Sequence, residues 1–229
     1  MAPADGPLRA LVVADGDIPT RPALDAVWPG WADGLRLVVA ADGGARGAER
    51  LGFEIDLVVG DCDSLGEADL VRLAAAGIEI RRAPADKDES DTELAVLAAI
   101  ERGAATVTVV GALGGSRFDH ALANVALLAL PALGDRPCAL LDPAARVRLL
   151  TGPGTLELPG QPGGVVSLLP FGDGVAGVTT EGLAFPLREE PLPAGPARGL
   201  SNVRLGKTAR VTVQAGRLLI VESPATLSR

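Results

Sequence analysis

The sequence has few of the residues that mark secreted, zinc-binding or nucleic-acid-binding proteins. Its 229 residues include two cysteines, Cys62 and Cys138, which excludes a disulfide framework and indicates a reducing compartment. The single histidine, His120, excludes a zinc site built on several imidazoles. Lys and Arg number 21 against 29 Asp and Glu, and the net charge of −8 leaves no broad basic surface for nucleic acid or anionic lipid. A phosphorylated ligand would therefore need metal cations to balance much of its charge.

Long hydrophobic runs are missing as well. The longest apolar stretch, Ala121–Leu133, is interrupted by Asn124 and Pro131 and falls short of the roughly 20 residues that span a bilayer. The N-terminal segment contains Asp5 and lacks the basic and then apolar pattern of a secretory signal. We therefore expect a cytoplasmic protein with no membrane partner. With 48% hydrophobic residues, the chain is able to bury a sizeable core.

The first 143 residues alternate short apolar runs with segments of helical length. The expected strands are Leu8–Ala14, Leu35–Ala41, Asp56–Gly60, Ile78–Arg82, Thr106–Gly111 and Cys138–Asp142. The expected helices between them are Ala45–Leu51, Glu67–Ala76, Asp91–Arg102 and Asp119–Leu130. Several strands are almost continuous in Val, Leu and Ala, which is typical of a parallel sheet buried on both faces. Residues 1–143 are therefore predicted to form an α/β domain with a mostly parallel sheet and flanking helices.

After Pro143 the composition changes, because Gly and Pro become frequent and the apolar runs become short. Four runs have the character of antiparallel strands: Val165–Leu169, Gly174–Val178, Ala209–Gln214 and Arg217–Val221. Gln214 to Gly216 is expected to be a tight connection between the last two. Residues 144–229 are therefore predicted to form a second, all-β and sandwich-like domain.

Acidic and glycine-rich segments follow four of the expected strands of the first domain. They are Asp42-Gly43-Gly44, Gly60-Asp61-Cys62-Asp63-Ser64, Asp86-Lys87-Asp88-Glu89-Ser90-Asp91 and Gly111–His120. In a parallel α/β sheet, ligands bind outside the carboxyl ends of the strands. The convergence of these segments on one edge of the sheet is the main functional signal in the sequence.

Asp61 and Asp63 are candidate ligands for a cation. Residues two apart in an extended segment point to the same side, so both carboxylates can face one ion. Mg²⁺ prefers such hard oxygen ligands together with substrate phosphates. The alternative is that Asp63 and Ser64 cap the helix that begins near Glu67.

The next acidic segment also allows two interpretations. Ser90 and Glu93 fit a capping box, which would place Asp91 in the first turn of a helix, where the helix dipole stabilises it. Capping does not account for Lys87 and Asp88. Lys87 is either a solvated ion-pair partner or a point charge for a phosphate.

The glycine-rich segment after the fifth strand is a candidate anion site. Gly114 and Gly115 leave backbone N–H groups open to an anion, and Arg117 is able to hold a phosphate through two hydrogen bonds. The alternatives are that Asp119 is an N-cap and that His120 is an exposed histidine in the first helical turn.

Taken in order along the chain, these segments resemble those of the thiamine pyrophosphokinase (thiamine diphosphokinase) family. The likeness continues in the second half through Val166–Pro170, Thr179–Leu183 and Gly199–Asn202. It implies transfer of a diphosphate from ATP to the hydroxyl of thiamine, with Mg²⁺ as the metal and AMP as the second product. It also implies a homodimer, with the thiamine pocket at the dimer interface.

The resemblance assigns roles to individual residues. The implied catalytic residues are Asp61, Asp63, Asp91, Arg117 and Asp119, of which the first three would hold the metal. The implied ATP-binding residues are Asp42, Gly43, Gly44, Lys87, Asp88, Gly114, Gly115 and His120. The implied thiamine-binding residues are Thr180, Glu181, Leu183, Ser201 and Asn202. The residue that accepts the proton of the thiamine hydroxyl is left open among Asp42, Asp63, Asp91 and Asp119.

One departure from the family pattern concerns Ser116, which separates Gly115 from Arg117 where the family has a contiguous Gly-Gly-Arg run. Two other functions remain as alternatives. One is a pyrophosphokinase for another hydroxymethyl heterocycle such as a pterin, against which the segment Gly199–Asn202 argues. The other is a non-catalytic thiamine or nucleotide sensor, which would be expected to have lost acidic ligands.

Overall fold

The computed structural model describes residues 6–225. Its contacts divide the chain into two compact units, Met1–Pro143 and Ala144–Arg229, here called the N-terminal and C-terminal units. No helix within the described residues is long and apolar enough to cross a membrane. Cys62 and Cys138 are free thiols, and burial raises the pKa of both, that of Cys138 to about 12.

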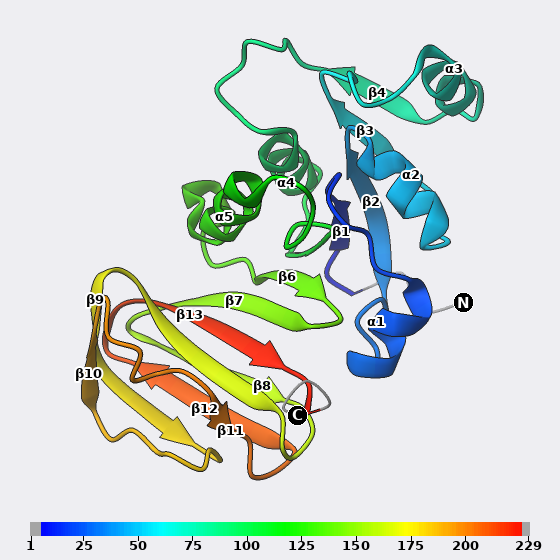
Figure 1. Cartoon of the computed structure of the whole chain (residues 1–229). Coiled ribbons are helices and arrows are strands. Elements are labelled where there is room, and N and C mark those ends of the chain that lie inside the picture. The colour runs from blue at the N-terminus through cyan, green and yellow to red at the C-terminus, as the bar shows by residue number, and fades with distance from the viewer. Residues whose placement is uncertain (1–5, 226–229) are drawn as a thin grey trace. The chain divides into compact units, whose positions relative to one another are not determined.

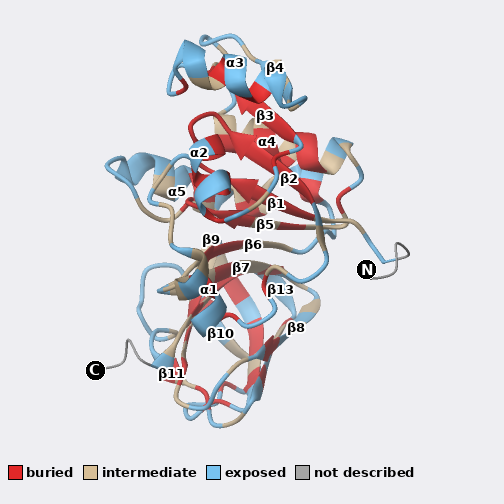
Figure 2. Ribbon diagram, turned by 90° about the vertical axis from the view of Figure 1, so that its right-hand side faces the viewer, coloured by how far each residue is buried: buried red, intermediate tan, exposed pale blue. Residues whose placement is uncertain are grey.

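The N-terminal unit is built on a parallel sheet with the strand order β4-β3-β2-β1-β5-β6. The strands are β1 (Arg9–Val13), β2 (Leu35–Ala41), β3 (Leu57–Gly60), β4 (Glu79–Arg82), β5 (Thr106–Val110) and β6 (Cys138–Asp142). Figure 2 shows that the central strands of this sheet are almost entirely buried. The predicted parallel α/β architecture is confirmed.

Helices cover both faces of this sheet (Figure 1). They are α1 (Arg21–Val27), α2 (Gly44–Arg50), α3 (Glu67–Ala75), α4 (Asp91–Glu101) and α5 (Phe118–Ala126). Leu24 of α1, Ala48 of α2 and Leu73 of α3 share one hydrophobic core with Leu11 and Val38 of the sheet. The helix α4 packs on the opposite face, against β1, β2 and β3.

The helix α1 was not expected from the sequence. Thr20 caps its N-terminus by accepting a hydrogen bond from the backbone N–H of Ala23, and a proline lies in its first turn. Trp28 follows the helix and donates its indole N–H to the backbone carbonyl of Asp142 at 2.8 Å. A helix of 7 residues contains too few apolar positions for their helical spacing to be recognised in the sequence.

The helix α5 is shorter than the predicted Asp119–Leu130. It ends at Ala126 and continues as two 3-10 turns, Leu127–Ala129 and Pro131–Leu133. Pro131 has no N–H to donate to a helical turn, so the apolar run that follows Ala126 does not extend the α-helix.

The C-terminal unit consists of antiparallel strands, and residues 144–225 contain no α-helix. Its strands are β7 (Ala145–Thr151), β8 (Gly154–Pro159), β9 (Val165–Glu181), β10 (Glu190–Pro193), β11 (Asn202–Val203), β12 (Thr208–Val213) and β13 (Ala215–Ser223). One layer has the order β7-β13-β9, and the other joins β8 to β12. A hydrophobic core with Leu158, Leu168, Val211 and Ile220 lies between them. The predicted all-β architecture is confirmed.

Two of the strands expected in this unit are one strand. The predicted Val165–Leu169 and Gly174–Val178 both belong to β9, which runs on to Glu181. Gly172 and Gly174 have positive φ angles of 104° and 133°, and this backbone lets the strand bend without ending. The first part of β9 pairs with β13, and residues 179–181 pair with β12, so one strand serves both layers.

The connection at Gln214 is tight, as expected, but it does not close a hairpin. On one side of it β12 pairs with β8 and β9, whereas on the other side β13 pairs with β7 and β9. The chain therefore changes layer at this point. The short apolar runs of β12 and β13 predicted two strands, but they gave no information about which other strands pair with them.

A buried ion cluster joins the layers at one end of the C-terminal unit. Glu222 of β13 is 2% exposed, and its carboxylate receives hydrogen bonds from Arg146 (2.8 Å), Arg148 (2.6 Å) and Arg204 (2.8 Å). Burial acts to raise the pKa of Glu222, but the hydrogen bond from Arg146 and the charges of Arg148 and Arg146 outweigh it, so the pKa is lowered.

Candidate active site

Three carboxylates meet at the carboxyl edge of the parallel sheet. One oxygen from each of Asp42, Asp61 and Asp91 lies within 4.8 Å of the other two. Asp42 follows β2 and Asp61 follows β3, and these strands are neighbours in the sheet. Asp91 is the first residue of α4, which packs on the same two strands. The strand order therefore brings together residues that are up to 49 positions apart in the sequence.

Asp42 is the most buried member of this group, at 3% exposure. Its Oδ2 accepts a hydrogen bond from the backbone N–H of Ser64 at 3.1 Å, whereas its Oδ1 is buried without a hydrogen-bond partner among residues 6–225. Burial raises the pKa of Asp42, the hydrogen bonds from Ser64 oppose the rise, and the charge of Asp91 adds to it. An unpaired buried carboxylate oxygen of this kind is a position that a cation would satisfy.

The backbone at Gly60 leaves room for these carboxylates. A Cβ at this position would lie 2.9 Å from Asp91 Oδ1 and 3.1 Å from the Cβ of Asp42, and Gly60 has a φ angle of 151°. Asp42 has a positive φ of 45°. Left-handed backbone at a residue other than glycine is uncommon and concentrates at functional sites.

Lys87 lies between two of the carboxylates. Its Nζ is 2.9 Å from Asp91 Oδ1 and 3.6 Å from Asp61 Oδ2, and its side chain is 11% exposed. Lys87 therefore lies among these carboxylates and is not a solvated ion-pair partner on the surface. Ser90 accepts a hydrogen bond from the backbone N–H of Glu93 at 3.1 Å, so its expected capping of α4 is confirmed, while Asp88 is exposed.

Asp63 lies outside the group of three carboxylates. It is exposed, its backbone N–H donates to Asp61 Oδ1 at 3.2 Å, and its own carboxylate accepts from the Ser64 hydroxyl. The alternative that Asp63 and Ser64 cap α3 is wrong, because the N-cap residue is Gly66 and no side chain bonds to the helix there. In the structure it is Asp42, and not Asp63, that stands with Asp61 and Asp91.

The glycine-rich segment that follows β5 is held by the segment that follows β1. The backbone N–H of Gly115 donates to Asp17 Oδ2 at 2.9 Å, and the N–H of Gly16 donates to the carbonyl of Gly111 at 3.1 Å. A Cβ on Gly16 would lie 2.4 Å from the carbonyl oxygens of Gly111 and Gly114, so the two segments are in direct backbone contact. One of the two N–H groups expected to face an anion is thus already bonded to a carboxylate.

The remaining predicted residues of this segment are at the surface. Arg117 and Asp119 bind each other, with Nη2 and Oδ2 2.5 Å apart and side-chain exposures of 64% and 63%. This pairing lowers the pKa of Asp119 to about 2. His120 is exposed, and Asp119 is not the N-cap, since α5 begins at Phe118 after Arg117.

Gly43 and Gly44 are buried at the start of α2. A Cβ on Gly44 would lie 2.1 Å from the carbonyl oxygen of Val13, and a Cβ on Gly43 would lie 2.4 Å from Asp15 Oδ2. Both glycines let α2 approach the end of β1 closely. Asp15 thereby joins the same edge of the sheet as Asp42.

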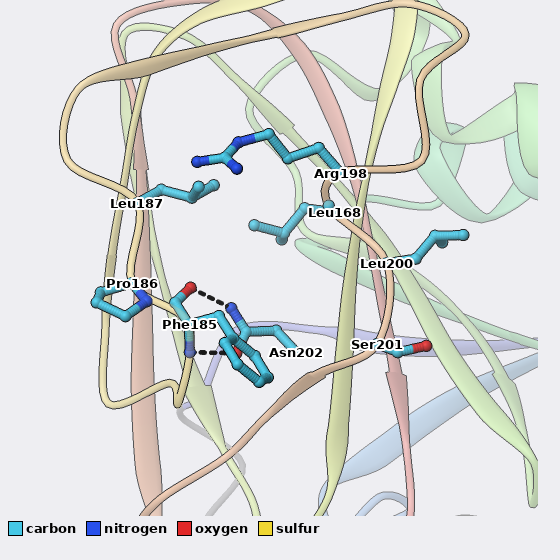
Figure 3. A pocket seen from close by; sticks show the side chains of 9 residues that line it. Leu168, Phe185, Pro186, Leu187, Arg198, Leu200, Ser201 and Asn202 are labelled. Carbon is cyan, nitrogen blue, oxygen red and sulfur yellow. Dashed lines mark hydrogen bonds between the residues drawn. The ribbon is translucent and has the colours of Figure 1, made fainter.

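The C-terminal unit has a pocket of about 150 Å³, shown in Figure 3. It is lined by Leu168 of β9 and by residues 185–187 and 198–202. Ser201 and Asn202 are therefore at the pocket, and the side chain of Ser201 points away from Phe185 in Figure 3. Ser201 has a positive φ of 58°, which is again a strained conformation for a residue other than glycine.

The other three residues expected to bind thiamine lie elsewhere in this unit. Thr180 is buried, and its hydroxyl accepts a hydrogen bond from the backbone N–H of Leu187 at 2.9 Å. Leu183 is 3% exposed and belongs to the hydrophobic core. Glu181 is exposed, 3.6 Å from Arg210. None of the three lines the pocket of Figure 3.

Comparison with known proteins identifies the family. The family model described as "Thiamin pyrophosphokinase, catalytic domain" matches residues 31–136, and the model described as "Thiamin pyrophosphokinase, vitamin B1 binding domain" matches residues 155–218. The two matches together span about three quarters of the chain. This chain belongs to the thiamine pyrophosphokinase family. The resemblance seen in the sequence, and with it the assignment to an enzyme, is confirmed.

Individual relatives agree with this family. A thiamine pyrophosphokinase of Bacillus subtilis is 26% identical over 165 residues, which are 72% of this chain and 76% of the relative. The crystal structure of a thiamin pyrophosphokinase from Geobacillus thermodenitrificans matches with a TM-score of 0.76 and 28% identity, over 94% of this chain and 97% of that one. The crystal structure of the Bacillus subtilis thiamine pyrophosphokinase matches with a TM-score of 0.80, 23% identity and coverages of 94% and 99%, and shows the same fold. Neither the pterin alternative nor the sensor alternative finds support among these relatives.

Sequence reasoning missed one segment at this edge of the sheet, the one that follows β1. Asp15, Gly16 and Asp17 stand directly after a buried strand, as do the acidic segments that were singled out. The strand itself was predicted, and β1 lies at the centre of the sheet between β2 and β5. In a parallel α/β sheet, ligands bind outside the carboxyl ends of the strands. Applying this rule to every predicted strand, β1 included, would have identified this segment.

Proposed function

We propose that this chain transfers the terminal diphosphate of ATP to thiamine at the carboxyl edge of the N-terminal sheet. The observation that carries the proposal is the convergence of Asp42, Asp61 and Asp91, with one carboxylate oxygen of each within 4.8 Å of the others. In the proposed reaction the hydroxyl oxygen of thiamine attacks the β-phosphorus of ATP. The bond from that phosphorus to the α,β-bridging oxygen breaks, AMP leaves, and the hydroxyl proton passes to a base.

The three carboxylates fit a hard divalent cation such as Mg²⁺. Asp42 Oδ1 is buried without a partner among the described residues, and Gly60 has no side chain that would fill the space beside Asp91. Asp42, Asp61 and Asp91 would hold the ion, with Asp63 close by. When bound, it supplies the positive charge that this acidic edge lacks for a triphosphate.

Lys87 would contribute a second positive charge to this edge. Its Nζ is held between Asp61 and Asp91, so the ammonium is oriented before any phosphate arrives. Enzymatic phosphoryl transfer depends mainly on positioning and on electrostatic stabilisation of the phosphate oxygens. The proposed ATP site is completed by eight further residues: Gly43, Gly44, Asp88, Gly114, Gly115, Arg117, Asp119 and His120.

The pocket of the C-terminal unit, with Ser201 and Asn202, is the proposed thiamine site. It lies within residues 155–218, which match the vitamin B1 binding domain. We further propose that the enzyme is a cytoplasmic homodimer in which each thiamine site draws on both copies. The exposed apolar side chains of Phe185, Leu200 and Leu205, which are 69%, 47% and 64% exposed, support a surface that is covered in the dimer.

The reaction is tested by product analysis with purified protein, Mg²⁺, ATP and thiamine. AMP should appear in step with thiamine diphosphate. The matched control replaces thiamine with a hydroxymethylpterin, which should give no AMP above background. Formation of ADP with thiamine monophosphate would contradict diphosphoryl transfer, and thiamine binding without any turnover would favour a sensor.

The shared site is tested by mixing an Asp61→Asn chain with an Asn202→Ala chain. If each site uses residues of both copies, a heterodimer holds one site with both lesions and one with neither. Subunit exchange should then raise activity above that of either parent. Full activity in a protein that light scattering finds monomeric at micromolar concentration would overturn the dimer proposal and leave the reaction untouched.

A further inference from the structure

Arg82 is the last residue of β4 and lies at the same edge of the sheet as the group of three carboxylates. The strand β4 pairs in parallel with β3, and the register places Arg82 opposite Gly60. The backbone N–H of Ala83 donates to the carbonyl of Gly60 at 2.8 Å, so the pairing continues to the end of both strands. Neighbouring strands lie about 4.8 Å apart. Since a Cβ on Gly60 would lie 2.9 Å from Asp91 Oδ1, Arg82 is a close neighbour of the group of three carboxylates.

The side chain of Arg82 is on the face of the sheet that carries Cys62. Successive residues of a strand point to opposite faces, so Arg82 shares its face with Ile80. Ile80 packs against the hydrophobic core that contains Cys62. Burial raises the pKa of the Cys62 thiol, and the charge of Arg82 opposes this rise. Because the interaction between charges weakens with distance, the guanidinium lies close to the segment that follows β3.

Arg82 differs in its pairing from the other cations of the proposed ATP site. Lys87 lies between two carboxylates, and Arg117 is paired with Asp119. Arg82 is exposed and makes no ion pair and no side-chain hydrogen bond with any of residues 6–225. Its guanidinium is therefore open to an anion that comes from outside the chain. A planar guanidinium holds a phosphate through two parallel hydrogen bonds.

We propose that Arg82 binds the β- and γ-phosphates of ATP, in addition to the residues of the ATP site named above. The inference rests on the proposed function, in which the phosphates of ATP approach the group of three carboxylates. The phosphates nearest to this group lie beside Gly60 and are therefore within reach of Arg82. Arg82 then supplies a positive charge that no carboxylate of the chain shares. AMP lacks both phosphates and is not held by this side chain.

Calorimetric titration of the purified protein with ATP and with AMP tests the proposal, in the presence of Mg²⁺ and the absence of thiamine. Arg82→Gln should weaken ATP binding about tenfold, the scale of a hydrogen bond between charged groups, and should leave AMP binding unchanged. Arg82→Lys keeps the charge but loses the two parallel bonds, so its ATP affinity should lie between the other two. Because the Arg82 side chain is exposed and unpaired among the described residues, these variants should fold as the wild type does.

The matched control is Arg81→Gln, which removes the same charge from the adjacent position of β4. Arg81 points to the opposite face of the sheet and pairs with Glu101 of α4 at 2.6 Å, in an ion pair that is largely exposed. The ATP affinity of Arg81→Gln should equal that of the wild type. A comparison of the two variants therefore separates a contact at Arg82 from the general effect of one positive charge fewer.

Three results would overturn the proposal. Wild-type ATP affinity in Arg82→Gln would remove the contact, and equal losses in Arg82→Gln and Arg81→Gln would show a general charge effect. An equal loss of AMP and ATP affinity in Arg82→Gln would remove the assignment to the β- and γ-phosphates. Failure of the proposed function looks different, because the wild-type protein itself would then release no AMP from ATP and thiamine, whatever the Arg82 variants bind.

Discussion

Lys87 Nζ lies 2.9 Å from Asp91 Oδ1 and 3.6 Å from Asp61 Oδ2, so one ammonium group is shared by two of the three clustered carboxylates. The two contacts place a positive charge where the carboxylates would otherwise repel one another. In the proposed site without nucleotide, Lys87 would therefore compete with a metal ion for the same negative charge. With a triphosphate in the proposed ATP site, the same ammonium would attract its oxygens.

Replacing Lys87 by methionine should move two measured quantities in opposite directions. Binding of Mg²⁺ to the nucleotide-free protein should become tighter, because the competing ammonium is gone. Turnover should fall by on the order of 10²-fold, the scale of losing one preorganised electrostatic contact. Calorimetric titration with Mg²⁺ and an AMP-release assay measure the two. A variant with weaker Mg²⁺ binding and normal turnover would place Lys87 outside the site.

The three clustered carboxylates and Asp63 should respond differently to loss of charge. Asp61→Asn should lower turnover by about 10²-fold or more and leave the melting temperature unchanged or higher, because one of several like charges is removed. Asp63→Asn should cost less activity, since Asp63 is exposed and outside the group of three. Asp86→Asn, an exposed change in the same acidic segment as Lys87, is the control. Equal losses in Asp61→Asn and Asp86→Asn would point to a general charge effect.

The group of clustered carboxylates illustrates how much of the candidate site could be predicted from the sequence. The sequence placed Asp42, Asp61, Asp63 and Asp91 at one edge, because the parallel strands that precede the first three were clear from their Val and Leu content. It favoured Asp61 and Asp63 as partners, because residues two apart lie on the same side of an extended segment. This rule holds only while the strand continues. The strand β3 ends at Gly60, and Cys62 has a positive φ of 64°, so the alternation is broken between the two. Such a turn depends on tertiary contacts that no local pattern reports.

The hydrogen bond from Gly115 to Asp17 gives a prediction that does not depend on catalysis. Asp17→Ala should accelerate hydrogen exchange at the Gly115 amide, because the carboxylate that accepts its N–H at 2.9 Å is removed. Asp17→Asn retains an acceptor oxygen and should keep most of the protection. Asp173→Ala, an exposed aspartate of β9, is the control and should leave the Gly115 amide unchanged. Unchanged exchange in Asp17→Ala would show that backbone contacts alone hold the glycine-rich segment.

The ion cluster of the C-terminal unit predicts a stability that depends on pH. Glu222→Gln should lower the free energy of unfolding by about 3–5 kcal/mol, because Arg146, Arg148 and Arg204 lose the buried carboxylate that pairs with them. Since the pKa of Glu222 is lowered from 4.5, its contribution is complete above that value and is lost as the pH falls below it towards the folded pKa. Denaturant unfolding from pH 7 to pH 3 measures both effects.

The control for this cluster is Glu157→Gln, which removes an exposed carboxylate paired with Arg210 at 2.8 Å. Exposed pairs contribute about 0–1 kcal/mol, so this variant should unfold almost as the wild type does. A Glu222→Gln protein as stable as Glu157→Gln would mean that solvent already screens the cluster.

The C-terminal unit shows what a local pattern leaves undetermined. Short apolar runs identified strand segments within β9, β12 and β13, yet the bend within β9 and the change of layer at Gln214 were not visible. The positive φ angles at Gly172 and Gly174 permit the bend, but glycine is equally common in turns that end a strand. The four strands β7, β8, β10 and β11 were missed, because their alternation is short or interrupted by proline and glycine.

Because β9 belongs to both layers of the C-terminal unit, the two layers are coupled when this unit unfolds. Residues 165–176 of β9 pair with β13, and residues 179–181 pair with β12, without a loop between them. Neither layer is able to release β9 while the other keeps its full ladder of backbone hydrogen bonds to that strand, since the two parts of β9 are continuous. The amides of β9 that pair with β13 and those that pair with β12 should therefore lose protection in the same event.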